Sequence, residues 1–155
     1  MPDALTGSSA WLPDVLAVQA IASGAMCGVI WFVQLVHYPL LGRLNDTDAR
    51  RATCENLRRT PWVVVPFMLA EGVTAMAVAV CPPAGVGRPV AVAGVAVVAA
   101  LWASTVLVQM PLHARLAAGD DMPRTTAALV RGNWLRTALW TARALLAGWM
   151  LTAAC

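Results

Sequence analysis

Four long apolar stretches alternate with polar segments along the chain, at about residues 15–41, 61–81, 89–112 and 134–154. Each is long enough for the ~20 residues with which an α-helix crosses about 30 Å of hydrocarbon. The pattern therefore predicts an all-α fold, an integral membrane bundle of four transmembrane helices that forms one domain over residues 1–155. The connecting segments are too short for a soluble catalytic domain or a nucleic-acid-binding module.

The composition points to the same surroundings. Hydrophobic residues make up 59% of the chain and charged residues 12%, and the mean hydropathy is +0.67. A soluble domain carries about 25% charged residues, so the expected partner of this surface is the lipid bilayer. The formal net charge of +3 fits a signal for membrane orientation, and we expect no nucleic-acid partner.

The positive charges are concentrated in two of the three connectors. Because basic residues in short loops stay on the cytoplasmic side, we expect both termini outside the cell and both basic connectors in the cytoplasm. Segments 45–48 and 119–123 carry capping residues, so each connector is expected to form a separate short helix along the inner membrane face. The arginines are Arg43, Arg50, Arg51, Arg58 and Arg59 in the first connector, and Arg115, Arg124 and Arg131 in the third.

The two halves of the chain resemble each other. A shift of 72 positions places segment 35–44 on segment 107–116 with six identical residues and no gap. The match continues through the polar connector, where Trp62 falls on Trp134. We infer a duplicated hairpin, with two parallel repeats that meet in the middle of the bundle. Pro39 and Pro111 are also equivalent, and each is expected to kink its helix near the inner surface.

Glu71 and Arg143 are charged residues inside apolar stretches. They are equivalent in the repeat, and the helical rise places both at about mid-bilayer. A charge at this depth costs at least about 2.5–3.5 kcal/mol on insertion scales and normally faces a partner or a water-filled cavity. We therefore expect an ion pair between the second and fourth helices, either as a packing contact only or as part of a functional site.

Other polar residues recur at steps of three and four on the remaining helices, so that each set shares one helix face. We expect these faces to enclose a pocket open to the inner leaflet, with Glu71 and Arg143 at its floor. The sets are Asn133, Arg136 and Trp140 on the fourth helix, Trp102, Thr105, Gln109 and His113 on the third, and Trp31, Gln34 and Tyr38 on the first, with His37 beside them.

Glu71 is the candidate catalytic base of this pocket. A carboxylate held by an arginine at low dielectric is able to take a proton from a bound molecule. The sequence contains no haem or flavin motif, so no cofactor is expected. A minority alternative is a metal ion at His37, His113 and Glu71, the residue types of a facial iron triad, although Glu71 lies about 7 Å deeper than His37 by helical rise.

Two motifs carry a resemblance to a known family. Segment 109–116 contains Pro111 and Leu112, and segment 133–137 opens the last apolar stretch with Asn, Trp and Arg. Together with Gly28 and segment 36–40, this pattern resembles the anthrone-oxygenase-like family of small four-helix membrane proteins. Members of that family carry a Pro-Leu-Asn-x-x-Leu element, and this chain has His113 where that Asn is expected.

The resemblance implies a membrane-embedded oxidoreductase of the oxygenase type, without a conventional cofactor. Its substrate would be a flat lipophilic molecule such as an aromatic, quinone-like or polyketide compound. Glu71 would act as base and Arg143 as its oxyanion partner. The other predicted roles are His37 and His113 as proton carriers, Trp31, Tyr38, Trp102 and Trp140 as pocket walls, and Gln34, Gln109, Asn133 and Arg136 as further substrate-binding residues.

Two other functions fit the same residues. The first is a membrane cyclase or isomerase of terpenoids that uses Glu71 as acid and base. The second is a lipid- or quinone-binding subunit or small carrier without enzymatic activity, in which Glu71 and Arg143 are structural and a homo-oligomer completes the path. Dioxygen consumption separates the oxygenase from the cyclase.

Overall fold

The computed structural model describes residues 11–154 of the chain. This part is all-helical and contains no strand, which confirms that the fold is all-α. Its helical segments join end to end into four rods. The rods comprise α1 (Leu12–Phe32), η2 (Val33–His37) and α2 (Tyr38–Leu41); α3 (Asp46–Val80); α4 (Arg88–Ser104), η3 (Thr105–Gln109) and α5 (Met110–Ala118); and α6 (Met122–Ala153).

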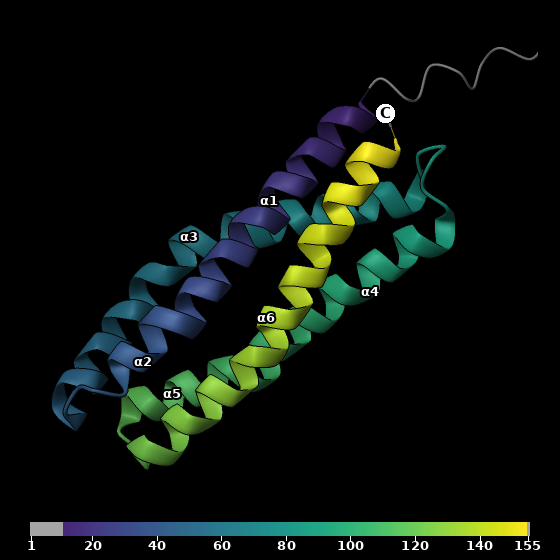
Figure 1. The fold of residues 1–155 in the computed structure, drawn as a ribbon. Coiled ribbons are helices and arrows are strands. Elements are labelled where there is room, and N and C mark those ends of the chain that lie inside the picture. The colour runs from purple at the N-terminus through teal and green to yellow at the C-terminus, as the bar shows by residue number, and fades with distance from the viewer. Residues whose placement is uncertain (1–10, 155) are drawn as a thin grey trace, which may run out of the picture.

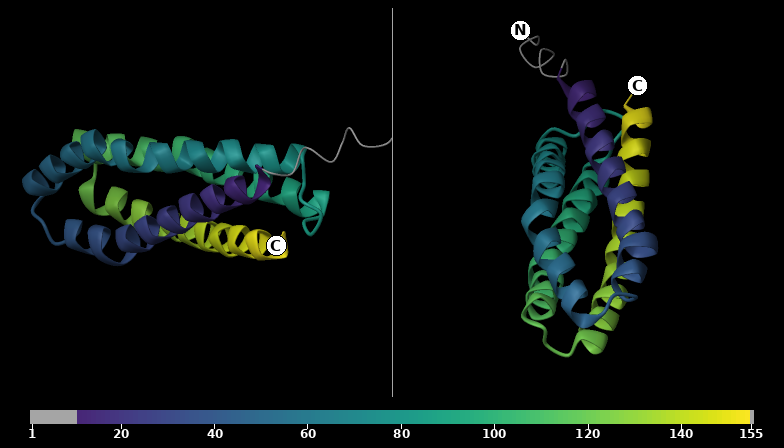
Figure 2. Two further views of the ribbon diagram at one scale, coloured as in Figure 1. Left: turned by 90° about the horizontal axis from the view of Figure 1, so that it is seen from above. Right: turned by 90° about the vertical axis from the view of Figure 1, so that its left-hand side faces the viewer.

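The four rods run antiparallel and form a closed ring of neighbours (Figure 1). α1 packs against α3 and α6, and α4 packs against the same two helices. Figure 2 shows α1 and α6 in one layer and α3 and α4 in the other. The start of α1 and the end of α6 lie at one end of the bundle, and both arginine-rich connectors lie at the opposite end, which we call the basic end.

Three of these rods are long and apolar enough to cross a membrane: Leu12–Leu41, Asp46–Val80 and Arg88–Ala118. They contain the first three predicted spans almost entirely. The fourth predicted span, 134–154, lies largely in α6, which is not among the three. Arg136 and Arg143 lower the hydropathy of α6, and both are buried against the other rods. A fourth crossing therefore stays a prediction.

The exterior of the bundle is more apolar than that of a soluble protein. Large apolar side chains are exposed on its outside, including Trp62 at 84%, Leu107 at 73% and Val73 at 69%. Within residues 11–154, twelve polar or charged residues are buried together with the apolar core. An apolar surface of this extent is unfavourable in water and favourable against acyl chains. The arrangement is that of a helical membrane protein.

The two rods that contain Pro39 and Pro111 each have a π-helical turn where a kink was expected. The η2 and η3 segments directly precede the turns that contain Pro39 and Pro111. Proline lacks an amide proton and disturbs the preceding turn. In that turn a hydrogen bond spans five residues instead of four, because the Tyr38 amide donates to the Val33 carbonyl. The two π segments begin 72 residues apart, at Val33 and Thr105.

The connectors differ from the prediction of separate surface helices. The predicted capping sites are correct, because Asn45 accepts a bond from the Asp48 amide at 3.0 Å and Asp121 accepts one from the Arg124 amide at 3.4 Å. However, both helices continue without a break into the apolar stretches, over 35 residues in α3 and 32 in α6. The reason is that the connectors contain no helix-ending residue after the cap, and the proline at position 61 is accommodated inside α3.

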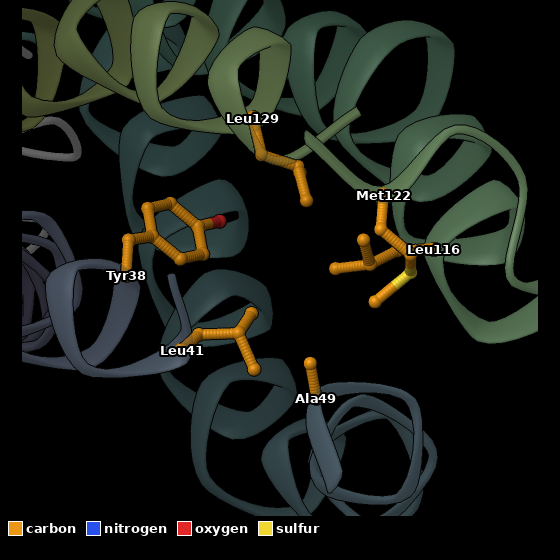
Figure 3. Packing of buried hydrophobic residues seen from close by; sticks show 6 residues of the cluster. All are labelled: Tyr38, Leu41, Ala49, Leu116, Met122 and Leu129. Carbon is orange, nitrogen blue, oxygen red and sulfur yellow. The ribbon is translucent and has the colours of Figure 1, made fainter. Parts of the chain in front are cut away.

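Apolar packing at the basic end joins α2, α3, α5 and α6. Figure 3 shows the buried side chains that converge there from these helices. Because their burial fixes the loops 42–45 and 119–121 against each other, it also fixes the ends of the rods that carry the candidate site. The cluster consists of Tyr38, Leu41, Ala49, Leu116, Met122 and Leu129.

Candidate functional site

The predicted ion pair forms in the middle of the bundle. Arg143 on α6 donates from Nε to Oε1 of Glu71 on α3. The second carboxylate oxygen accepts a hydrogen bond from the Ser23 hydroxyl of α1 at 2.6 Å. Both charged side chains are 0% exposed. An intramembrane charge with this degree of burial requires such partners.

Two further residues complete this arrangement. The side-chain amide of Gln19 satisfies its hydrogen bonds when its oxygen and nitrogen are exchanged. In that orientation the Gln19 oxygen accepts a hydrogen bond from Arg143 Nη2 at 2.6 Å. On the opposite side, a Cβ at Gly94 of α4 would lie 2.8 Å from Arg143 Nη1, so glycine is needed there to make room for the guanidinium. We call Gln19, Ser23, Glu71 and Arg143 the central ion-pair cluster.

Gln19 and Ser23 were not predicted as site residues. The signal was present, because they precede Met26 and Ile30 at helical spacing on one face of α1, and all four are buried. The prediction considered only the half of this helix that lies nearer the basic end. It therefore ended the polar face at Trp31 and missed the two residues that hold the ion pair.

The central ion-pair cluster is closed rather than open to a pocket. Both oxygens of Glu71 are occupied by Ser23 and Arg143, and neither charged side chain has accessible surface. Each oxygen of Glu71 accepts one hydrogen bond, and the carboxylate has no accessible surface. In this geometry Glu71 links α1, α3 and α6.

Gly94→Ala is expected to destabilise the protein. The added methyl group would press on a guanidinium that Glu71 and Gln19 hold in place, and overpacking of this kind costs about 1–3 kcal/mol. Gly148→Ala in α6 is the matched control, because nothing lies within 4 Å of its Cβ position and alanine is the better helix former. Denaturation in mixed micelles measures the difference, and equal stability of the two variants would contradict the close approach.

A second polar cluster lies between α6 and the π-helical segments. Asn133 donates from Nδ2 to Gln34 Oε1 of η2 at 2.8 Å. Arg136 donates from Nη1 to Asn133 Oδ1 at 3.3 Å, and Thr137 donates its hydroxyl proton to the Asn133 carbonyl at 2.9 Å. The three predicted residues Gln34, Asn133 and Arg136 thus form one buried chain of hydrogen bonds that links η2 to α6.

Beside this chain lie buried polar atoms without a hydrogen-bond partner anywhere in residues 11–154. They are both side-chain amide atoms of Gln109, Nδ1 of His113, Nε of Arg136 and Nε1 of Trp140. Leaving such an atom unpaired costs about 1–3 kcal/mol, so several in one region are unfavourable unless water or a ligand binds there. We call Gln109, His113, Arg136 and Trp140 the unpaired polar cluster.

The geometry of the helices brings this cluster together. Gln109 and His113 are one helical turn apart at the junction of η3 and α5, and Arg136 and Trp140 are one turn apart on α6. A Cβ at Gly132 would lie 2.9 Å from Gln109 Nε2, so this amide packs directly against α6. The Tyr38 hydroxyl lies 3.4 Å from His113 Nε2.

Two of the four predicted aromatic walls, Trp31 and Trp102, are partly exposed, whereas Tyr38 and Trp140 are buried. Trp31 and Trp102 are 37% and 36% exposed. Trp31 donates from Nε1 to Thr141 at 3.0 Å and packs edge-on against Trp134 with ring centroids 5.9 Å apart. Trp31 precedes η2 and Trp102 precedes η3, and the wider turn of a π segment rotates the helix face that follows it. Regular spacing by three and four therefore placed Trp31 on one face with Tyr38, and Trp102 on one face with Gln109.

The minority metal site does not form. No group of three or more His, Cys, Asp or Glu side chains within the described part of the chain is placed to hold a metal ion. His37 is half-buried, with its ring 5.7 Å from that of Tyr38, and His113 faces the same tyrosine from α5. Glu71 is enclosed in the central ion-pair cluster, so these three residues make no triad.

These features define a helical membrane protein with two buried polar clusters. In the central ion-pair cluster only Nη1 of Arg143 has no hydrogen-bond partner within residues 11–154, whereas the unpaired polar cluster has five such atoms. Comparison of the chain with models of protein families, with curated proteins and with solved structures gave no match. The resemblance to the anthrone-oxygenase-like family therefore stays a prediction from the sequence.

Proposed function

We propose that the chain crosses the membrane four times, as two parallel hairpins from a duplicated ancestor, with both termini outside and the basic end in the cytoplasm. The position of the irregular turns supports the duplication, since η2 and η3 begin 72 residues apart. The partners of the central ion pair have the same separation. The arginines at one end support the orientation.

We further propose that the protein binds a lipophilic small molecule at the unpaired polar cluster. The observation that carries this proposal is the set of buried groups without partners, most of which are hydrogen-bond donors: Arg136 Nε, Trp140 Nε1 and Gln109 Nε2. Converging donors next to a positive charge suit an oxygen acceptor such as a quinone carbonyl or a phenolate. The apolar exterior of the bundle would let such a molecule enter from the bilayer.

The chemistry proposed for this site is that of an oxygenase. The substrate of this reaction is a tricyclic phenol whose central ring carries a carbonyl opposite a methylene group. His113 Nδ1 takes a proton from this methylene carbon, and Arg136 stabilises the oxygen of the resulting enolate. The carbanion adds dioxygen, and the proton on His113 converts the adduct to a hydroperoxide. This intermediate loses water and leaves a carbonyl, so one oxygen atom enters the product and the other leaves as water. The substrate anion supplies the electrons, so no bound cofactor is required.

Oxygen uptake tests this proposal. Protein in lipid nanodiscs, supplied with a tricyclic phenol that has a central methylene, is expected to consume dioxygen and to form the ketone. Arg136→Gln should lower turnover about 10²–10³-fold, the usual effect of losing an oxyanion donor. Arg51→Gln removes an exposed arginine at the basic end and should leave turnover unchanged. The oxygenase proposal is wrong if neither substrate loss nor dioxygen uptake exceeds that of empty nanodiscs.

A binding protein without enzymatic activity is the second candidate, and the closed central ion-pair cluster favours it. With both oxygens of Glu71 occupied, the site has no carboxylate to act as acid or base, and the terpenoid cyclase has no proton donor in Glu71. Ligand binding that is weakened by Arg136→Gln, in the absence of dioxygen uptake, would support a quinone- or lipid-binding subunit instead of the oxygenase.

A further inference from the structure

A basic pocket lies at the basic end of the bundle, apart from both polar clusters. Its volume is about 460 Å³, and it lies between α5 and the first turns of α6. The lining combines charged and apolar side chains, as the head and the first carbons of a lipid would require. The lining residues are Leu112, Arg115, Asp121, Arg124, Thr125, Ala127, Ala128 and Arg131.

The charges of this pocket are only partly neutralised. Its one aspartate, Asp121, pairs with Arg124 at 3.6 Å. Arg115 and Arg131 form no ion pair with any residue that the structure describes. Two arginines that line one pocket without an acidic partner attract an anion with several oxygen acceptors, as a phosphate has.

The first connector provides a contrast within the same protein. There, Glu55 pairs with Arg58 and with Arg59, each at 2.9 Å, and Arg50 donates from Nε to the Ala117 carbonyl at 2.7 Å. Three arginines of the first connector thus make bonds inside the protein. Arg115 and Arg131 line a pocket and make no such ion pair within the described residues.

We propose that this pocket binds the phosphate of an anionic phospholipid. The phosphodiester oxygens lie between Arg115 and Arg131, and the first part of an acyl chain lies along Leu112 and the two alanines of α6. The position supports a lipid, because the pocket opens where the Arg88–Ala118 rod ends and phospholipid head groups lie at the ends of membrane-crossing helices.

The test uses short-chain dioctanoyl phosphatidylglycerol as probe and the detergent-purified full chain, with binding measured by thermophoresis. The double variant Arg115→Gln with Arg131→Gln should weaken binding about 30-fold, because each arginine near a lipid phosphate contributes about fivefold to the affinity. Both residues are exposed, so the double variant should fold normally. Dioctanoyl phosphatidylcholine should bind the wild type at least tenfold more weakly, because its head group carries no net charge.

The repeat supplies the matched control. Arg43 and Arg59 occupy the equivalent positions in the first half, 72 residues earlier, and neither lines the pocket. Arg43→Gln with Arg59→Gln should change the affinity less than twofold. An equal loss in both double variants would show a diffuse charge effect and overturn the proposal. Competition by inorganic phosphate or glycerol phosphate at the same concentration as the lipid would show a site for free phosphate and overturn it too.

Discussion

Arg143→Met is expected to lower the free energy of unfolding by about 3–5 kcal/mol, because it leaves the carboxylate of Glu71 buried without its cation. Glu71→Leu should have a similar effect, since the guanidinium would then keep only Gln19 as a partner. Titration of the purified protein with a denaturing detergent, followed by circular dichroism, measures both changes. Ser23→Ala provides a scale, because it removes one hydrogen bond to the same carboxylate and should cost about 1.5–3 kcal/mol.

The double replacement separates structure from catalysis. Glu71→Leu combined with Arg143→Met removes both charges at once, and apolar pairs often replace buried ion pairs without loss. The double variant should therefore recover to within about 1–2 kcal/mol of the wild type. It should also keep ligand binding at the unpaired polar cluster. A variant that folds well but loses all turnover would restore Glu71 as the catalytic base and contradict the role assigned to it here.

The central ion pair could be predicted because the physical rule behind it is strong. Two charged residues in apolar stretches, at equal depth and in equivalent repeat positions, have few alternatives to facing each other. The same rule could not predict that the cluster is closed. That outcome depends on Ser23 and on the absence of a side chain at Gly94, and both look like ordinary small residues of a membrane helix in the sequence.

The positions of Trp31 and Trp102 could not be predicted because helical spacing assumes a regular helix. Trp102 and Gln109 are seven residues apart in sequence, which places them on one face at 3.6 residues per turn. The π turn between Thr105 and Gln109 breaks this relation. Pro39 and Pro111 did predict the place of each irregularity, but the form it takes depends on which backbone bonds the bundle can satisfy.

If the two halves arose by the proposed duplication, they have diverged so that one polar site is left. A shift of 72 positions places Gln109, His113, Arg136 and Trp140 on His37, Leu41, Val64 and Met68. Three of these counterparts are apolar, and Val64 and Met68 pack against the same core as Trp140. The unpaired donors therefore belong to the second half alone, although Tyr38 of the first half contacts His113. A duplicated bundle of this kind is expected to bind one ligand rather than two.

Two buried glutamines give the sharpest test of that site. Gln34 and Gln109 both lie in π segments and are 4% and 2% exposed. The Gln34 oxygen accepts a bond from Asn133 at 2.8 Å, whereas both amide atoms of Gln109 are unpaired within the described part of the chain. Replacement by methionine keeps the length of the side chain and removes its polar atoms, so any difference in effect reports the difference in pairing.

Gln109→Met is expected to raise the free energy of unfolding of the ligand-free protein by about 1–3 kcal/mol, because a buried unpaired amide is removed. The same variant should bind the tricyclic phenol at least tenfold more weakly, since it loses a donor to the ligand oxygen. Gln34→Met should instead destabilise the protein, because Asn133 then loses its acceptor. Denaturation and binding are measured in parallel for both variants. If Gln109 has a purely structural role, both variants should lose stability. If Gln109 is kept for a ligand, the two changes in the free energy of unfolding should have opposite signs.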